Sequence, residues 1–229
     1  MTHSYSFKYE ELTIDLPEIV RVLGYEGQEL PEPFPTYLAL VADDCKNLTD
    51  ISGSYCITEQ CVVDPDNKKI VANDLDFNVG KTICNELNGS SNLAFFICTA
   101  GETVSKKSEI LLKGEDPVLG YVYDVFGSVI AEAAANKIQD MIKAEAQKSG
   151  SNISNRYSPG YCQWHVSDQP KLFSLFNGST SNVNLTSSFL MNPVKSVSGV
   201  IGIGKKVKYR DYQCALCGLQ TCIYRKMRT

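Results

Sequence analysis

The stretch that decides the fold is Asp116–Lys148, DPVLGYVYDVFGSVIAEAAANKIQDMIKAEAQK. It begins with Asp before Pro, an N-cap and first-turn pair that favours the start of a helix. Apolar residues then recur at helical spacing through Ile142, and Gly150 follows as a stop signal. These features predict one helix of roughly 30 residues, about 45 Å long. On its helical wheel, Glu132 lies at the border of the apolar stripe.

The segments on either side of this helix are rich in strand-forming residues or in turn residues. The segments predicted as strands are Tyr37–Ala42, Tyr55–Val63, Leu93–Thr99 and Ser196–Gly204. The predicted turn, loop and short helix are Asn88–Asn92, Ser149–Asn155 and Lys171–Phe176, respectively. Strands, then one long helix, then further strands indicate an α+β domain.

The composition excludes several classes of protein. The chain has 229 residues, is 43% hydrophobic and 21% charged, and carries a formal charge of −4. It is therefore neither disordered nor fibrous, and it lacks the basic excess of a nucleic-acid binder. Its apolar runs fall short of the ~18 residues of a membrane span, and its first residues lack a signal-peptide pattern. We expect a single cytoplasmic domain over residues 1–229 that binds neither nucleic acid nor membrane.

The chain has nine cysteines, and this odd number argues against a framework in which every cysteine is paired in a disulfide. Five scattered ones are predicted to be buried free thiols: Cys45, Cys56, Cys61, Cys84 and Cys98. The last three, Cys214, Cys217 and Cys222, lie within nine residues. Three thiols at this spacing are compatible with an iron–sulfur cluster, with Zn²⁺ or with a small terminal fold of free thiols. The residues from 205 onward are basic, which fits either a solvated face or a docking surface for an acidic electron donor or for a cobalamin protein.

Arg156–Tyr161, RYSPGY, is the segment that carries the most chemical information. An arginine can hold a carboxylate through two parallel hydrogen bonds. Pro-Gly fixes a turn and allows the backbone to approach a ligand closely. A tyrosine ring can face a cation. These residue types are compatible with a site for a small zwitterionic ligand and equally with an ordinary Pro-Gly turn.

The longer run Arg156–Gln169, RYSPGYCQWHVSDQ, resembles the reactivation domain of cobalamin-dependent methionine synthase. Two later segments in the same order, Leu185–Pro193 and Ser196–Gly199, are similar to that domain as well. The helix segment Ala131–Ala133 lies at the expected distance upstream. The resemblance covers roughly residues 115–204 and implies a bent, mostly antiparallel sheet with a long helix packed on it.

The resemblance also implies a set of ligand contacts for S-adenosylmethionine (AdoMet). In that family the motif arginine, here Arg156, holds the AdoMet carboxylate, and the helix glutamate, here Glu132, is positioned to pair with its ammonium. The remaining contacts implied by the resemblance are Ser158, where the synthase has alanine, Gly160, Tyr161 and, by counting from Gly199, Tyr209. No catalytic residue is expected, because the methyl group passes directly to cobalt and the protein mainly positions it.

The function implied by the resemblance is AdoMet-dependent reductive methylation, that is, reactivation, of a cobalamin. None of the synthase's domains for homocysteine, folate and cobalamin is found in the 229 residues, so we expect a corrinoid protein as partner and a flavodoxin- or ferredoxin-type electron donor. The chain would act as a methyltransferase component only with that partner. The expected organisation is an amino-terminal β-rich part (1–114), the AdoMet-binding part (115–204) and a basic cysteine-rich tail (205–229). The alternative is a non-enzymatic module that binds a corrinoid protein or carries an iron–sulfur cluster without AdoMet.

Overall fold

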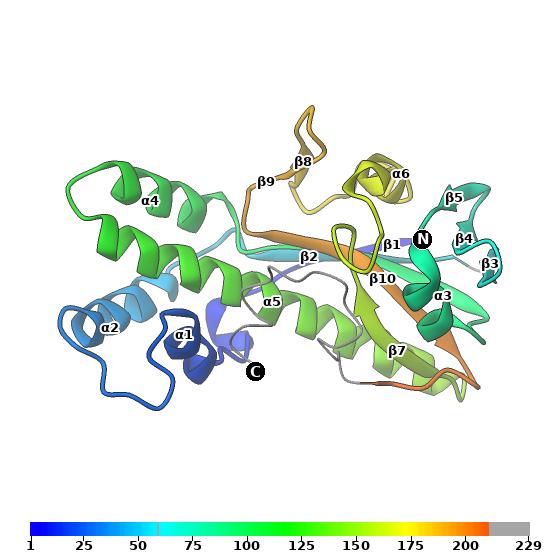
Figure 1. Cartoon of the computed structure of the whole chain (residues 1–229), viewed down its shortest axis with the longest axis horizontal. Coiled ribbons are helices and arrows are strands. Elements are labelled where there is room, and N and C mark those ends of the chain that lie inside the picture. The colour runs from blue at the N-terminus through cyan, green and yellow to red at the C-terminus, as the bar shows by residue number, and fades with distance from the viewer. Residues whose placement is uncertain (59, 211–229) are drawn as a thin grey trace.

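The computed structural model describes residues 1–58 and 60–210, and its centre is one five-stranded antiparallel sheet (Figure 1). The strands follow the spatial order β1 (Thr2–Ser6), β2 (Ser52–Thr58), β6 (Asn92–Thr99), β10 (Ser196–Gly204) and β7 (Asn152–Tyr157). The strands predicted at Leu93–Thr99 and Ser196–Gly204 are confirmed, as is the α+β class. β1 and β7 are the two edges of this sheet.

The long helix α5 (Pro117–Lys148) packs on one face of the sheet, as predicted (Figure 1). The Asp116 carboxylate caps its first turn by accepting a 2.9 Å hydrogen bond from the Leu119 N–H. Helices α1 (Leu16–Val22), α2 (Phe34–Cys45) and α4 (Glu102–Lys113) contact α5 on the same side of the sheet. Alternate residues of β6, Ala94, Phe96 and Cys98, face this core, because side chains alternate along a strand.

The opposite face of the sheet carries a second apolar core. Leu93, Phe95 and Ile97 of β6 point into it. It is covered by α3 (Gly80–Leu87), by α6 (Gln169–Ser174) and by a small antiparallel sheet of β3 (Cys61–Asp64), β4 (Lys69–Ala72) and β5 (Leu75–Phe77). The short 3-10 helices Tyr9–Glu11 and Val166–Asp168 and the hairpin of β8 (Asn184–Leu185) and β9 (Met191–Asn192) complete the described part.

The strand predicted at Tyr37–Ala42 is wrong, because this segment lies inside helix α2. Leu38, Val41, Ala42 and Cys45 recur at helical spacing and pack into the core that contains α5. Their β-branched and aromatic neighbours favour a strand locally, and packing against α5 overrides that preference.

Two further boundaries differ from the sequence-based expectation. The single strand predicted at Tyr55–Val63 is two strands in different sheets, β2 and β3. The loop predicted at Ser149–Asn155 ends early, since β7 begins at Asn152. Strand β7 pairs with β10, which lies more than 40 residues further along the chain, so local composition does not reveal the pairing.

Helix α5 is long and apolar enough, by length and composition alone, to cross a membrane. In the fold, 61% of its most apolar 18-residue window is buried against the sheet and the neighbouring helices. The core helix of a globular domain meets the same criterion, so the apolar character of α5 is explained by its packing.

Candidate functional site

A β-bulge in the edge strand β7 positions Arg156. Between the pairs Ile201–Arg156 and Ile203–Ile153, β7 has two residues, Ser154 and Asn155, where β10 has only Gly202. The Ser154 hydroxyl accepts a 2.9 Å hydrogen bond from the Gly202 N–H, which fixes the irregular register. Residues three apart in a regular strand face opposite sides, but here Ile153 joins the α5 core and Arg156 reaches α5 as well. The bulge therefore turns the arginine toward the long helix.

Three polar residues of α5 accept hydrogen bonds from the Arg156 guanidinium. Its Nη2 lies 2.6 Å from Glu132 Oε2, and its Nη1 donates to Asn136 Oδ1 at 2.6 Å and to Gln139 Oε1 at 3.4 Å. Positions 132, 136 and 139 are separated by four and three residues, so they lie on one face of the helix. The structure thus brings together the two charged residues that the sequence singled out, and it pairs them with one another.

The segment after β7 forms the expected Pro-Gly turn. The Tyr161 N–H donates to the Ser158 carbonyl at 3.3 Å, with Pro159 and Gly160 as the central residues. Gly160 has φ +96°, which the third position of a type II turn requires and which glycine adopts without strain. A Cβ at Gly160 would meet only Val166, at 3.5 Å, so conformation rather than space is the constraint there. The Tyr161 side chain is 44% exposed.

The loop that follows this turn is tightly held. Cys162 and Gln163 both have positive φ, a strained conformation for residues with side chains. Trp164 is 1% exposed and packs edge-on against Phe77, so it is a packing residue. Its indole N–H donates to the buried Asp168 carboxylate at 3.2 Å. These contacts fix the base of the segment that carries Ser158, Gly160 and Tyr161.

The last described residues, Tyr209 and Arg210, lie beside strand β7. The Asn155 side chain accepts a 2.8 Å hydrogen bond from the Arg156 N–H and donates a 3.2 Å hydrogen bond to the Arg210 carbonyl. The backbone next to Tyr209 therefore lies beside β7, while the Tyr209 side chain is 52% exposed. Its predicted role as a ligand contact stays a prediction.

Most of the predicted free thiols are confirmed within residues 1–58 and 60–210. Cys45, Cys56, Cys84 and Cys98 are buried and unpaired, and Cys61 is partly exposed. The described residues contain no cluster of three or more Cys, His, Asp or Glu side chains suited to a metal ion. Cys214, Cys217 and Cys222 lie outside the described residues, so their predicted metal or cluster site stays a prediction.

The charges of both Arg156 and Glu132 affect the pKa of the Cys98 thiol. Burial strongly raises its pKa, while Arg156 acts in the opposite direction and Glu132 adds to the increase. The thiol therefore stays protonated and behaves as an apolar core group rather than as a nucleophile. What remains at the surface is a cation and an anion side by side, next to a backbone turn and an exposed aromatic ring.

The residues that hold Arg156 in place are not among those predicted from the sequence. Asn136 and Gln139 follow Glu132 at one and two helical turns, and this spacing was available as a signal once Glu132 was singled out. Asn155 gave no comparable signal, because its role depends on the bulge in β7 and on the returning chain at Arg210.

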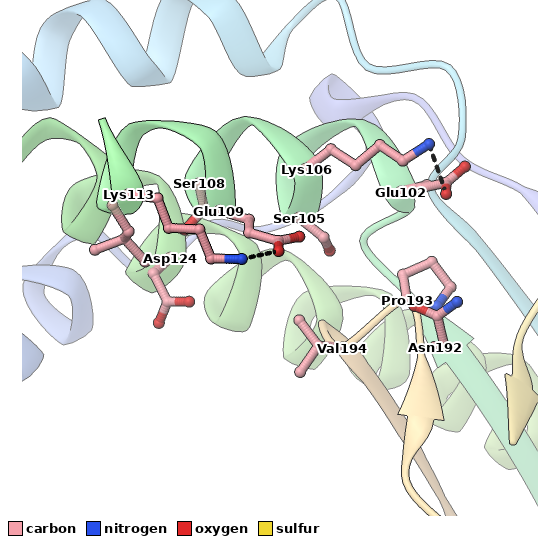
Figure 2. Close-up of a pocket in the computed structure, with 11 residues that line it drawn as sticks. Glu102, Ser105, Lys106, Ser108, Glu109, Lys113, Asp124, Asn192, Pro193 and Val194 are labelled. Atoms are coloured by element: carbon pink, nitrogen blue, oxygen red, sulfur yellow. Dashed lines mark hydrogen bonds and ion pairs between the residues drawn. The ribbon is translucent and has the colours of Figure 1, made fainter. Parts of the chain in front are cut away.

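A cavity of about 310 Å³ lies elsewhere in the fold, between α4 and the segment that joins β9 to β10 (Figure 2). Its lining combines two ion pairs of α4, Lys106–Glu102 and Lys113–Glu109, with Asp124 of α5 and Asn192–Val194. It includes none of the predicted ligand residues. The predicted ligand residues instead lie on or beside strand β7, in the turn that follows it and on the facing part of α5. We call this surface the β7 edge.

Comparison with known proteins completes this description. The fold and the site define a class of α+β domains in which a long helix and an edge strand of the sheet supply opposite charges to one surface. A family model for the activation domain of vitamin B12 dependent methionine synthase matches residues 40–222, so the chain belongs to this family. A solved structure described as the MetH reactivation domain bound to AdoHcy (S-adenosylhomocysteine) is similar in fold, with a TM-score of 0.66 and 14% sequence identity. The match covers 92% of this chain and 80% of that one. No curated protein matches the sequence.

Proposed function

We propose that this protein binds AdoMet at the β7 edge and supports reductive methylation of a corrinoid presented by a partner. The observation that carries the proposal is the meeting of Arg156 and Glu132 in a chain of the methionine synthase activation family. A solved structure with this fold is described as AdoHcy-bound, which supports a ligand of the same chemical class.

Each charged part of AdoMet has a suitable residue at this site. Arg156 would hold the carboxylate, Glu132 the ammonium, and the exposed Tyr161 ring would face the sulfonium. Ser158 and Gly160 belong to the turn that places Tyr161, in which the Ser158 carbonyl accepts from the Tyr161 N–H. The proposed site also includes Tyr209, whose backbone neighbour bonds to Asn155. Both Tyr161 and Tyr209 are well exposed, and an open surface suits a methyl group that must reach a cobalt on another domain or chain.

The ligand supplies the chemistry, and the protein supplies position. The partner's cobalamin, once reduced by one electron from a low-potential donor, would accept the methyl group from the sulfonium sulfur, which would leave AdoHcy. The residues of this chain bind and orient the methyl donor, and no proton needs to move. We propose a flavodoxin- or ferredoxin-type donor. Lys205, Lys206 and Lys208, exposed just after β10, would attract its acidic surface.

Calorimetric titration of AdoMet and AdoHcy into the anaerobically purified chain tests the binding step. We expect saturable binding that weakens about 100-fold in Arg156→Ala, the loss typical of a bidentate charged hydrogen bond. Lys106→Ala, which removes an exposed cation of α4, is the matched control and should bind as the wild type does. Equal binding by Arg156→Ala and wild type would contradict the proposed site.

A second measurement separates a methyl-transfer component from a binding module. The chain, a cob(II)alamin protein and a low-potential reductant are mixed with AdoMet, and the absorption of methylcobalamin is followed. Methylation that depends on Arg156 supports the proposed function. Binding of the corrinoid protein without any use of AdoMet would favour the alternative of a non-enzymatic module. An absorption spectrum of the same preparation shows whether the cysteine-rich tail carries an iron–sulfur cluster.

A further inference from the structure

The Arg156–Glu132 ion pair occupies the two groups that the proposed ligand would need. Arg156 Nη2 and Glu132 Oε2 are 2.6 Å apart, and the two side chains are 19% and 52% exposed. A largely buried guanidinium is costly without an anion beside it. The arginine is therefore satisfied either by Glu132 or by a carboxylate that takes its place.

The arginine is held independently of Glu132. Its Nη1 donates to Asn136 at 2.6 Å and to Gln139 at 3.4 Å, while its Nη2 is the group that reaches Glu132. A guanidinium has five N–H donors in a fixed plane, so two of them can stay on α5 while others receive a new partner. Glu132 is the more exposed member of the pair, and its side chain is free to turn toward solvent or toward a cation of the ligand.

We propose that the ion pair is exchanged on binding for the two charges of the ligand's amino-acid group, and that Asn136 holds Arg156 in place during the exchange. The ligand carboxylate takes Glu132's place on Arg156, and the ligand ammonium takes Arg156's place on Glu132. This inference rests on the proposed function, and it makes the site selective for ligands that carry both charges. A ligand with one charge leaves either Arg156 or Glu132 without a partner.

Three analogues of AdoHcy separate the two charges: one without the amino group (desamino-AdoHcy), one without the carboxyl group (decarboxylated AdoHcy), and methylthioadenosine, which lacks both. Calorimetry with the wild-type chain should give AdoHcy an affinity about tenfold or more above that of each single-charge analogue. Equal affinities for AdoHcy and its single-charge analogues would overturn the exchange.

Glu132→Gln gives the sharpest test, because the change keeps the shape of the side chain and removes only its charge. AdoHcy should bind about tenfold more weakly to this variant. Desamino-AdoHcy should bind about three- to fivefold more tightly, because Glu132 no longer competes for Arg156. A merely structural role for Glu132 would weaken both ligands together, and that result would overturn the proposal.

Asn136→Ala tests the positioning role. Asn136 is exposed on α5 and alanine is a good helix former, so the variant should fold. We expect about fivefold weaker binding of AdoHcy and of desamino-AdoHcy, with unchanged binding of decarboxylated AdoHcy. Gln147→Ala, another exposed position of the same helix, is the matched control and should change none of them. A uniform loss across all the ligands in Asn136→Ala would contradict the assigned role.

The binding data distinguish a failure of the ion-pair exchange from a failure of the proposed function. If the wild-type chain binds neither AdoMet, AdoHcy nor any analogue, the proposed function fails and the exchange fails with it. If the wild type binds AdoHcy and Glu132→Gln weakens AdoHcy and desamino-AdoHcy in parallel, the exchange alone fails and the proposed function stands.

Discussion

Two ion pairs join helix α5 to the sheet, and their surroundings differ. Asp124 contacts Lys195, just before β10, at 2.8 Å, and Glu132 contacts Arg156 of β7 at 2.6 Å. Lys195 also donates to Ser128, its carbonyl accepts from the Ala100 N–H, and its side chain is 13% exposed. The first pair thus has a largely buried cation and an acid that is 37% exposed, whereas the second pair ends on a glutamate that is 52% exposed. Under the proposed exchange, the same type of contact is structural at one place on a helix and exchangeable about 12 Å further along.

Lys195→Met should produce the largest loss of stability among the changes considered below. Methionine keeps the apolar stem and removes the charge, which leaves Asp124 without its cation. The pair is only partly buried, so we expect a loss of about 2 kcal/mol in the free energy of unfolding, between the values typical of surface and buried pairs. Chemical denaturation measures it, and AdoHcy affinity should not change.

The control for this prediction is Lys106→Met, which removes the cation from a well-exposed pair on α4. It should change stability by less than about 0.5 kcal/mol. Equal losses in the two variants would mean that the Asp124–Lys195 contact is no more structural than an ordinary surface pair.

Gly127 of α5 provides the space through which the Lys195 side chain passes. A Cβ at this position would lie 2.8 Å from Lys195 Cγ. Gly127→Ala should therefore destabilise the wild-type protein by about 1 kcal/mol, as overpacking does. In a Lys195→Ala background the same change should stabilise the protein by up to about 1 kcal/mol, because alanine favours a helix over glycine. Denaturation of the four proteins gives both values, and a loss in both backgrounds would contradict this account.

The two regions also differ in how well the sequence predicts them. Helix α5 could be placed from Asp116–Pro117 at its start and Gly150 after its end, because caps and periodicity are local signals. The strand β10 could be placed for the same reason. Strand β7 and its bulge depend on pairing with a distant strand, so the local sequence of Asn152–Asn155 predicts a loop. The residue chemistry, the helical wheel and the resemblance together indicate Arg156 and Glu132 as candidates, but their contact with each other and with Asn136 depends on the folded sheet.

Asp116, the N-cap residue of α5, gives a smaller and pH-dependent effect. A hydrogen bond from the Tyr37 hydroxyl and another from the Leu119 N–H lower the pKa of Asp116 below its usual 3.8. Because the folded pKa lies below the unfolded one, the stabilisation is complete above pH 3.8 and is lost as the pH falls through the folded value. Asp116→Asn still caps the helix, so it should change stability little at pH 7 and remove part of the acid sensitivity. Denaturation midpoints between pH 2 and pH 7 test this, and parallel profiles for the two proteins would contradict it.

Glu132→Gln should have the smallest effect on stability and still the clearest effect on binding. Glu132 is 52% exposed, and Asn136 and Gln139 keep their hydrogen bonds to the guanidinium, so we expect a change below about 1 kcal/mol in the free energy of unfolding. Glutamine can still accept from Arg156 Nη2, and Asn136 keeps its own contact with the guanidinium. Denaturation and calorimetry on the same preparation separate the two readouts. A loss of stability as large as that of Lys195→Met would mean that the Glu132–Arg156 pair is as structural as the Asp124–Lys195 pair, and the distinction between the two pairs would then disappear.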